Sequence, residues 1–350
     1  MKHDQVIRLA LLAGTVIIVA VALQQTRSER ESRRYITLTS EPQGIMGTTC
    51  RLAVVTRPVD ESRATEALAS AESILRSIEL DVSSWLEGSR ISRFNQARAG
   101  DEITLSATSQ AILQYAHDAW QLTEGTFDVT VRPLIQLWRE AAGTATPPGD
   151  DALETARQQS SWDLVDLTRE HIIKRGDGVE IDLGGIAKGY AIDQAVEALQ
   201  GAGAAGGLVD VGGDLRVFGQ PPDGRAWRVV IRDPSGSGAL ERLTLPSGAV
   251  CTSGDYSRFY EIGGERYSHI IDPRTGRPAA AALSVSVIAT TALEADIWAT
   301  SLSILGPQGL AMVPDGMEAM MVVTMLQDGV ITHNTVTSPL FEQYIDITDR

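Results

Sequence analysis

Cysteine and histidine are scarce in this sequence, and the few that occur are scattered. The chain of 350 residues contains two cysteines, Cys50 and Cys251, and five histidines. Neither cysteine has a second cysteine or a histidine at the spacing of a zinc site, and one pair cannot form a disulfide framework. We expect both thiols to be buried in strands as small apolar side chains. A single Cys50–Cys251 bridge stays open as the alternative.

Positive charge is also in short supply. The chain has 45 acidic and 30 basic residues, a formal net charge of −15. A protein of this charge repels a phosphate backbone and gains nothing from counterion release, so no nucleic acid partner is expected. To bind a small phosphorylated ligand, the protein would need a local source of positive charge, such as a metal ion or a helix N-terminus.

The sequence lacks both a fixed-period repeat and a Pro/Ser/Gly-rich linker long enough to separate two units. Its composition, 43% hydrophobic and 21% charged, is that of an ordinary globular protein with material for a large core. We therefore predict one compact body over residues 35–350, preceded by an N-terminal segment over residues 1–34.

The N-terminal segment carries an uncharged apolar run from Leu9 to Leu23. Such a run is typical of a cleaved secretion signal or of a membrane anchor, and both interpretations remain open. Four arginines follow the run within residues 27–34, whereas only two basic side chains, Lys2 and Arg8, precede it. That bias predicts a body in the cytoplasm.

The remaining pattern predicts a mixed α/β (α+β) fold with a largely antiparallel sheet core flanked by helices. Helical spacing of apolar residues predicts helices near residues 67–78, 106–124, 187–199 and 293–305. A Pro/Gly-rich surface loop is expected at 144–151. Strands are expected at 44–56, 172–183, 207–219, 227–232, 249–253, 256–262, 267–271 and 283–290.

The sharpest local motif covers residues 180–190, where a predicted strand ends in Gly184 and Gly185 and a helix begins. Glycines allow close approach of a ligand, and a new helix offers free N–H groups to an anion. The motif is not a phosphate-binding P-loop, because Lys188 is followed by glycine. Two interpretations remain: a ligand-binding turn or a tight structural turn.

Asp296 and Thr300 stand four residues apart on the helix predicted near 293–305. Their side chains therefore lie on one face of that helix, one turn apart. A carboxylate and a hydroxyl are hard oxygen ligands that suit Mg²⁺ sharing its shell with phosphates. A capping or buried hydrogen-bonded pair is the simpler alternative.

His269 lies among hydroxyl residues and a Pro/Gly turn, with Asp272 three residues later. The pair is suited to a general base and the group that orients it. A hydrogen-bonded structural histidine at a strand end is the alternative.

The segment after Gly125 offers polar groups at Asp128 and Thr130 and an aromatic ring at Phe127. These groups suit hydrogen bonds to the edge of a ligand ring and stacking on its face. A turn that delivers Phe127 to the core is the alternative. Residues 211–214 (VGGD) form either a close-approach turn or a bulge.

In order and spacing, these motifs resemble those of the ApbE-type FAD:protein FMN transferase family. The matching segments span about residues 44 to 305. They are residues 45–48 (IMGT), 81–95 (DVSSWLEGSRISRFN), 125–138 (GTFDVTVRPLIQLW), 182–193 (DLGGIAKGYAID), 211–214, 252–256 (TSGDY), 268–276 (SHIIDPRTG) and 295–300 (ADIWAT). One departure is Arg90, where the family usually has glutamate.

The resemblance implies roles for individual residues. Positions that contact FAD in the family are Met46, Trp85, Thr126, Phe127, Asp128, Asp182 and Lys188, and Ile270 lies beside the flavin nucleotide. The Mg²⁺ site corresponds to Asp296 and Thr300 with the backbone carbonyl of Gly185. His269 occupies the position proposed for catalysis, and Asp272 is the candidate to orient it.

The function implied by the resemblance is Mg²⁺-dependent transfer of FMN from FAD to a Ser or Thr of an acceptor flavoprotein, with release of AMP. The aromatic Trp85 favours transfer over hydrolysis. Two alternatives stay open: an FAD pyrophosphatase that yields FMN and AMP, and an FAD-binding protein without catalysis. The resemblance further implies an acceptor subunit in a membrane redox complex and a periplasmic body anchored at the inner membrane. The arginine bias predicts the opposite, a cytoplasmic body.

Overall fold

The computed structural model describes residues 34–236, 238–254, 259–327 and 330–347. The predicted anchor or signal segment therefore lies outside the described residues, apart from residue 34. Within the described ranges, no helix has both the length and the apolar character that a bilayer crossing requires.

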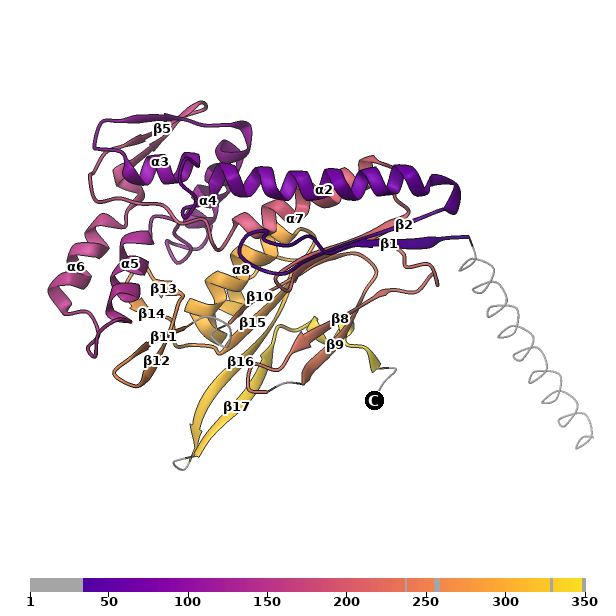
Figure 1. The fold of residues 1–350 in the computed structure, drawn as a ribbon. Helices are drawn as coiled ribbons and strands as arrows, with labels where there is room; N and C mark the ends of the chain where they lie inside the picture. Colours follow the sequence, from indigo (N-terminus) through magenta and orange to yellow (C-terminus); the bar gives the residue numbers. More distant parts are fainter. Residues whose placement is uncertain (1–33, 237, 255–258, 328–329, 348–350) are drawn as a thin grey trace, which may run out of the picture.

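The centre of the fold is an eight-stranded sheet in the order β1-β2-β6-β7-β10-β15-β16-β17 (Figure 1). Every neighbouring pair in it is antiparallel, which confirms the predicted sheet type. The strands are β1 (Ile36–Ser40), β2 (Cys50–Thr56), β6 (Gly206–Val211), β7 (Asp214–Gly219), β10 (Gly248–Gly254), β15 (Ser284–Ala289), β16 (Glu318–Gln327) and β17 (Val330–Thr337).

Strands β6 and β7 correspond to the single strand predicted over residues 207–219. The chain reverses at Gly212 and Gly213, which both have positive φ, and Val211 pairs with Asp214 across the turn. Only glycine adopts two consecutive positive φ values at little cost, which is the requirement of a two-residue hairpin turn. The segment at 211–214 is thus a hairpin turn and not a bulge.

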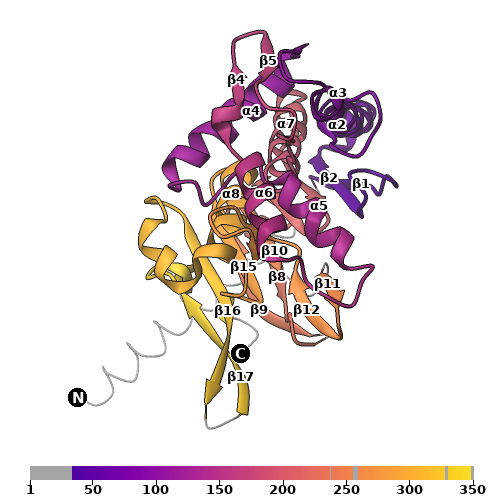
Figure 2. The ribbon, with the colours of Figure 1, turned by 90° about the vertical axis from the view of Figure 1, so that its left-hand side faces the viewer.

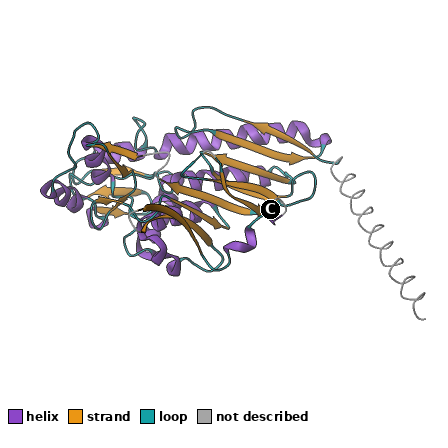
Figure 3. Cartoon of the chain, turned by 90° about the horizontal axis from the view of Figure 1, so that it is seen from below, coloured by secondary structure: helices purple, strands orange, loops and turns teal. Residues whose placement is uncertain are grey.

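Three helices cover one face of the sheet: α2 (Glu61–Val82), α7 (Ala187–Gly201) and α8 (Ala292–Leu305). Helix α2 buries a stripe at helical spacing that includes Ala67, Ala71 and Leu75. Helix α8 is buried on nearly all sides because it packs on β10 and β15 of the sheet and against α7 beside it. Helix α2, the longest of the three, runs in nearly the same direction as the strands (Figure 3). The main hydrophobic core lies between these two layers.

The other face of the sheet is covered in part by the hairpin of β8 (Trp227–Arg232) and β9 (Ala239–Leu245). A second apolar cluster joins this hairpin to the sheet through Leu215, Val217, Val250, Ile288 and Met320. Coverage of both faces explains why β15 is buried at all six positions and why β10 has three consecutive buried residues at 249–251.

A third unit is carried at one end of the sheet (Figure 2). It comprises helices α5 (Arg132–Ala141) and α6 (Asp150–Gln159) with strands β11 (Phe259–Ile262), β12 (Glu265–Ser268), β13 (Ile271–Asp272) and β14 (Arg277–Pro278). Leu134, Trp138, Leu153, Ile262 and Ile271 form its core. The Trp138 Nε1 donates a hydrogen bond to the Gly276 carbonyl at 2.8 Å, which ties helix α5 to the turn after β13.

The remaining elements lie beside α2. Helices α3 (Arg90–Gln96) and α4 (Ala107–Leu122) accompany a small sheet of β3 (Glu102–Thr104), β5 (His171–Lys174) and β4 (Val165–Leu167). Short 3₁₀ turns occur at Pro58–Asp60, Trp162–Leu164, Gly306–Met312 and Phe341–Tyr344.

The strand predicted over 172–183 is wrong beyond Lys174, where β5 ends. Residues 175–183, called the crossing segment below, then run without sheet pairing to other described residues apart from a single bridge at Glu180. Asn95 holds this crossing: its side-chain amide donates to the Ile181 carbonyl at 2.9 Å and its side-chain oxygen accepts from the Ile181 N–H at 2.7 Å. A side chain thus takes the place of a neighbouring strand.

Both cysteines are free and buried, as predicted. Cys50 begins β2 and Cys251 lies in β10, and strands β6 and β7 separate them in the sheet. Since neighbouring strands are about 4.8 Å apart, this separation exceeds the reach of a disulfide.

Candidate functional site

Helices α7 and α8 meet with almost no space between their backbones. A Cβ placed at Gly189 would lie 2.3 Å from the Ala292 carbonyl oxygen, so only glycine allows this approach. The contact brings the beginning of α7, with Lys188, against the first turns of α8, with Asp296. The glycines after residue 182 therefore serve both helix packing and the geometry of the site.

Gly185, Asp296 and Thr300, which the resemblance assigns to the Mg²⁺ site, lie together at this junction. A Cβ at Gly185 would lie 2.9 Å from the Thr300 Oγ1. Asp296 precedes Thr300 by one turn of α8, and its Oδ2 accepts a hydrogen bond from the Gly189 N–H at 3.0 Å. The Ser253 Oγ, on β10, lies 3.5 Å from the Thr300 Oγ1. Three segments far apart in sequence, around Gly185, Ser253 and Asp296, thus meet here.

The Asp296 carboxylate is buried, exposing only 2% of the residue. Burial raises the pKa of Asp296, while Lys188 and the hydrogen bond from Gly189 favour its charged form. In the part of the chain that the structure describes, no three His, Cys, Asp or Glu side chains gather to hold a metal. A cation at this junction would rely on one carboxylate together with hydroxyl and carbonyl oxygens. Such a hard oxygen set fits Mg²⁺, which retains water and phosphate ligands of its own.

Lys188 is paired with the buried carboxylate of Asp214, at the start of β7. The other oxygen of Asp214 accepts a hydrogen bond from the Thr252 N–H at 2.9 Å. The hairpin turn at 211–214 therefore delivers Asp214, which fixes the lysine beside the α7–α8 junction. The later part of the motif at 252–256, Asp255 and Tyr256, lies outside the described residues.

Asp193 caps the helix that carries Asp296 and Thr300. Its two carboxylate oxygens accept hydrogen bonds from the Ala292 and Leu293 N–H groups, each at 2.9 Å. The Arg216 Nη1 donates to the same carboxylate at 2.7 Å. Helix α7 thereby sets the position of helix α8 through a buried cap.

Met46 lies in a tight turn with backbone φ of +48°, an unusual value for a side chain of this size. The turn closes with a hydrogen bond from the Thr48 N–H to the Ile45 carbonyl at 3.0 Å. A Cβ at Gly212 would lie 2.7 Å from the Thr48 Oγ1, so this turn packs against the β6–β7 hairpin turn that precedes Asp214. Backbone strain of this kind is common where a ligand contact requires it.

Asp182 is the centre of a second group of polar contacts. Its Oδ2 accepts hydrogen bonds from the Ser84 Oγ at 2.8 Å and from the Arg132 Nη1 at 3.4 Å. Its Oδ1 accepts from the Gly184 N–H at 2.8 Å, which shapes the turn into α7. Asp182 therefore links the loop after α2, the start of α5 and the glycine turn.

Trp85 lies next to Ser84 and is largely exposed, with 59% of its surface accessible. The guanidinium groups of Arg132 and Arg139 both approach its ring, each with Cζ 4.7 Å from the ring centroid. An exposed indole restrained by two cations is a preformed surface for a planar ligand.

The segment 126–128 adds three further features. Phe127 is buried, and a Cβ at Gly185 would lie 3.3 Å from its ring. The Thr126 hydroxyl is buried without a hydrogen-bond partner among the described residues. Asp128 Oδ1 accepts from the Thr130 N–H and hydroxyl at 2.8 and 2.7 Å. Burial raises the pKa of Asp128 to about 6. A buried hydroxyl without a partner is suited to a polar group of a ligand.

His269 and Ile270 lie between β12 and β13, in the unit tied to α5. The Ile270 N–H donates to the Ser268 Oγ at 3.1 Å, and its carbonyl accepts from the Ala279 N–H at 2.8 Å. Asp272 follows in β13, but its carboxylate is occupied by Arg274, which donates to it from Nε and Nη2, each at 2.9 Å. The described contacts of Asp272 thus favour a role in the turn rather than beside His269.

Several residues that position the site were not singled out from the sequence. They are Ser84, Asn95, Arg132, Arg139 and Asp193. All five lie within or beside the motifs, but no spacing rule indicates which partner each would meet. Arg90, the departure from the family pattern, pairs with Asp81 and donates to the Thr104 carbonyl at 3.2 Å. It therefore joins α2 to β3.

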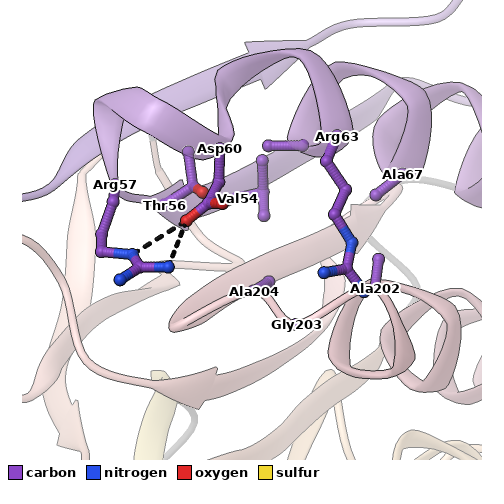
Figure 4. Close-up of a pocket in the computed structure, with 10 residues that line it drawn as sticks. Val54, Thr56, Arg57, Asp60, Arg63, Ala67, Ala202, Gly203 and Ala204 are labelled. Atoms are coloured by element: carbon purple, nitrogen blue, oxygen red, sulfur yellow. Dashed lines mark hydrogen bonds and ion pairs between the residues drawn. The ribbon is translucent and has the colours of Figure 1, made fainter.

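A small cavity of about 70 Å³ lies away from this site, at the far end of α7 (Figure 4). Arg63 and the ion pair of Arg57 with Asp60 line it, together with residues 202–204 after α7. Since α7 begins at the site and ends at this cavity, about 22 Å of helix separates them. The cavity contains none of the predicted site residues.

Comparison with known proteins shows the family of this chain. The ApbE family model matches residues 46–321. FAD:protein FMN transferases from Salmonella typhimurium and Vibrio cholerae are 33% and 31% identical to the chain, over 87% and 81% of its length and 88% and 86% of theirs. The solved flavin transferase ApbE from Vibrio cholerae superposes with a TM-score of 0.75 at 29% identity, covering 89% of this chain and 99% of that one. This chain therefore belongs to the ApbE family.

Proposed function

We propose that the protein is an FAD:protein FMN transferase. It would transfer the FMN half of FAD to a Ser or Thr hydroxyl of an acceptor protein and release AMP. Two observations support the proposal: relatives covering most of the chain bear that name, and the residues that the resemblance assigns to Mg²⁺ converge. The convergence of Gly185, Asp296 and Thr300 beside Lys188 carries the argument.

Mg²⁺ is the cation that we propose for the junction of α7 and α8. A protein with net charge −15 does not attract a diphosphate without local positive charge. A bound Mg²⁺ supplies that charge and polarises the phosphate to be attacked. Asp296 and Thr300 would hold it by their side-chain oxygens and Gly185 by its carbonyl. Lys188, fixed by Asp214, adds a cation on the same side.

The flavin and nucleotide parts of FAD would lie along the second group of residues. Trp85 offers an exposed ring, Asp182 a carboxylate, and Thr126 a buried hydroxyl without a partner among the described residues. Phe127 connects this group to Gly185. Met46 and Ile270, which the resemblance also assigns to FAD, would complete the contacts from the sheet and from the β12–β13 connection.

The transfer step would proceed by attack of the acceptor hydroxyl oxygen on the phosphorus nearer riboflavin. A new O–P bond forms, the diphosphate P–O bond breaks, and AMP leaves with the bridging oxygen. His269 would accept the hydroxyl proton. The carboxylate of Asp272, the candidate to orient His269, is bound by Arg274.

The acceptor and the location are further parts of the proposal. We infer an acceptor flavoprotein subunit of a membrane redox complex, and a periplasmic body anchored at the inner membrane by the N-terminal segment. The apolar run from Leu9 to Leu23 supports a membrane or export role for that segment. A reporter fused to the C-terminus tests the location, because activity of a cytoplasm-only reporter would contradict a periplasmic body.

The decisive test is incubation of the purified protein with FAD, Mg²⁺ and a candidate acceptor subunit. Mass spectrometry of the acceptor should show the added mass of FMN on one Ser or Thr, with stoichiometric AMP. A parallel reaction without acceptor separates transfer from hydrolysis. Rapid release of FMN and AMP in that reaction would identify an FAD pyrophosphatase, and bound FAD without any product would identify a non-catalytic binding protein.

A further inference from the structure

Arg132 occupies a central position beside the proposed FAD site. It is the first residue of helix α5 and exposes only 8% of its surface. Its Nε donates to the Glu180 Oε2 at 2.9 Å and its Nη1 to the Asp182 Oδ2 at 3.4 Å. Two carboxylates from the crossing segment thus hold the guanidinium plane in place.

The same guanidinium lies over the indole of Trp85, with Cζ 4.7 Å from the ring centroid. Arg132 is therefore in contact with both Asp182 and Trp85, which belong to different segments of the chain. Ser84, the neighbour of Trp85, also donates to Asp182 at 2.8 Å. The segment of Ser84 and Trp85, the Asp182 carboxylate and the Arg132 guanidinium are therefore all in mutual contact.

Arg139 restrains the same ring from later in the helix. It follows Arg132 by seven residues, so the two side chains lie on the same face of α5. Its Cζ is also 4.7 Å from the Trp85 centroid, but the residue is exposed. With both cations in place, Trp85 still exposes 59% of its surface. A ligand can therefore contact the indole without displacing either arginine.

We propose that Arg132 and Arg139 are positioning residues of the FAD site. Arg132 fixes the Trp85 indole and the Asp182 carboxylate relative to each other, and Arg139 restrains the indole. Neither arginine touches the reacting phosphorus in this proposal. The inference rests on the proposed function, since it concerns the binding of FAD.

The test is a double-mutant cycle on FAD affinity, measured by titration of the full-length protein with FAD in the presence of Mg²⁺. Arg139→Met should weaken binding about two- to fivefold, the range of an exposed cation–π contact. Combined with Trp85→Ala, the same change should have no further effect. Arg132→Met should weaken binding about tenfold or more. Part of this effect should remain in the Trp85→Ala background, because the loss of Arg132 also releases Asp182.

Steady-state transfer separates positioning from chemistry. Both substitutions should raise KM for FAD in step with Kd and leave kcat within about twofold. Arg132→Lys should recover part of the affinity, since it keeps the charge beside Asp182 but not the planar contact. Arg157→Met, an exposed arginine on neighbouring α6, is the matched control for charge and should bind FAD as the unmodified protein does.

Thermal unfolding identifies any variant that fails to fold. Because Arg132 is buried, Arg139→Met provides the independent test: the exposed position does not threaten the fold. The proposal is overturned if Arg139→Met leaves the FAD Kd unchanged. It is also overturned if the substitution raises the Kd by the same factor in the presence and in the absence of Trp85. If the unmodified protein binds no FAD, the proposed function itself fails, which is a different outcome.

Discussion

A Cβ at Gly185 would lie 2.9 Å from the Thr300 Oγ1 and 3.3 Å from the Phe127 ring. The glycine therefore sets the distance between the turn into α7 and the helix that carries Asp296. Its φ is not in the left-handed region, so the requirement at this position is space and not backbone freedom. The relationship makes the junction sensitive to a single methyl group.

Gly185→Ala is expected to lower FMN transfer by at least about tenfold, because the added methyl group separates the Gly185 carbonyl from Thr300. The cost in stability should be about 1–3 kcal/mol. Gly201→Ala, at the other end of α7, is the control, since no described atom outside the neighbouring backbone lies within 4 Å of its Cβ position. Equal activity of the two variants would contradict the proposed role of Gly185.

Asp296→Asn is expected to lower transfer by about 100-fold or more, because the proposed Mg²⁺ site would lose the one carboxylate among its proposed ligands. Mg²⁺ should raise the melting temperature of the unmodified protein in the presence of FAD, and this rise should disappear in the variant. Asp118→Asn, at an exposed position of α4, controls for the change of charge. A variant that keeps full activity at the same Mg²⁺ concentration would exclude Asp296 as a ligand.

Asp193→Ala removes the acceptor of the first two N–H groups of α8 and leaves Arg216 without its carboxylate. Loss of two buried backbone partners and one ion pair should destabilise the protein by about 2–3 kcal/mol. The Mg²⁺ concentration for half-maximal activity should rise as α8 shifts. Glu197→Ala, at an exposed position of α7, should change neither the stability nor the Mg²⁺ requirement. Urea unfolding and Mg²⁺ titration of both variants measure the difference.

Asp128 should make stability depend on pH in mildly acidic solution. Burial raises its pKa from 3.8 to about 6 in the folded protein. The folded state therefore binds its proton more tightly than the unfolded state, so this group stabilises the fold below pH 3.8, and that contribution is lost as pH rises through 6. The difference corresponds to about 3 kcal/mol.

Asp128→Asn retains an acceptor for the two bonds from Thr130 and removes the titration. The variant should be more stable than the unmodified protein at pH 7.5, and the stability difference between them should shrink toward pH 4. Chemical denaturation at several pH values measures this. A difference that stays constant over the range would show that Asp128 does not titrate there.

His269→Gln is expected to lower kcat by about 100-fold or more while the Kd for FAD changes little. Asp272→Asn should lower kcat less than about tenfold, because its carboxylate is bound to Arg274. Comparable losses in the two variants would restore Asp272 as the group that orients His269.

Local patterns were sufficient for most of the long elements. Helices α2, α4, α7 and α8 were predicted because each presents apolar residues at helical spacing, and β8, β10 and β15 because β-branched residues recur in them. Helices α3, α5 and α6 were not predicted. Helix α3 has seven residues and α6 buries only Leu153 and Ala156, so neither shows a period. Helix α5 was missed although it buries Leu134 and Trp138 one turn apart.

The sequence by itself determined the chemistry available to this protein: its motifs, their order, and the resemblance that assigns them to FAD and Mg²⁺. Only the tertiary structure decided which groups meet. Lys188 pairs with Asp214, Asp193 caps α8, and Arg132 joins Asp182 to Trp85. The physical reason is that these contacts join segments far apart in the chain. Periodicity and spacing describe neighbours within one element, whereas a glycine-sized gap between two helices exists only once they pack.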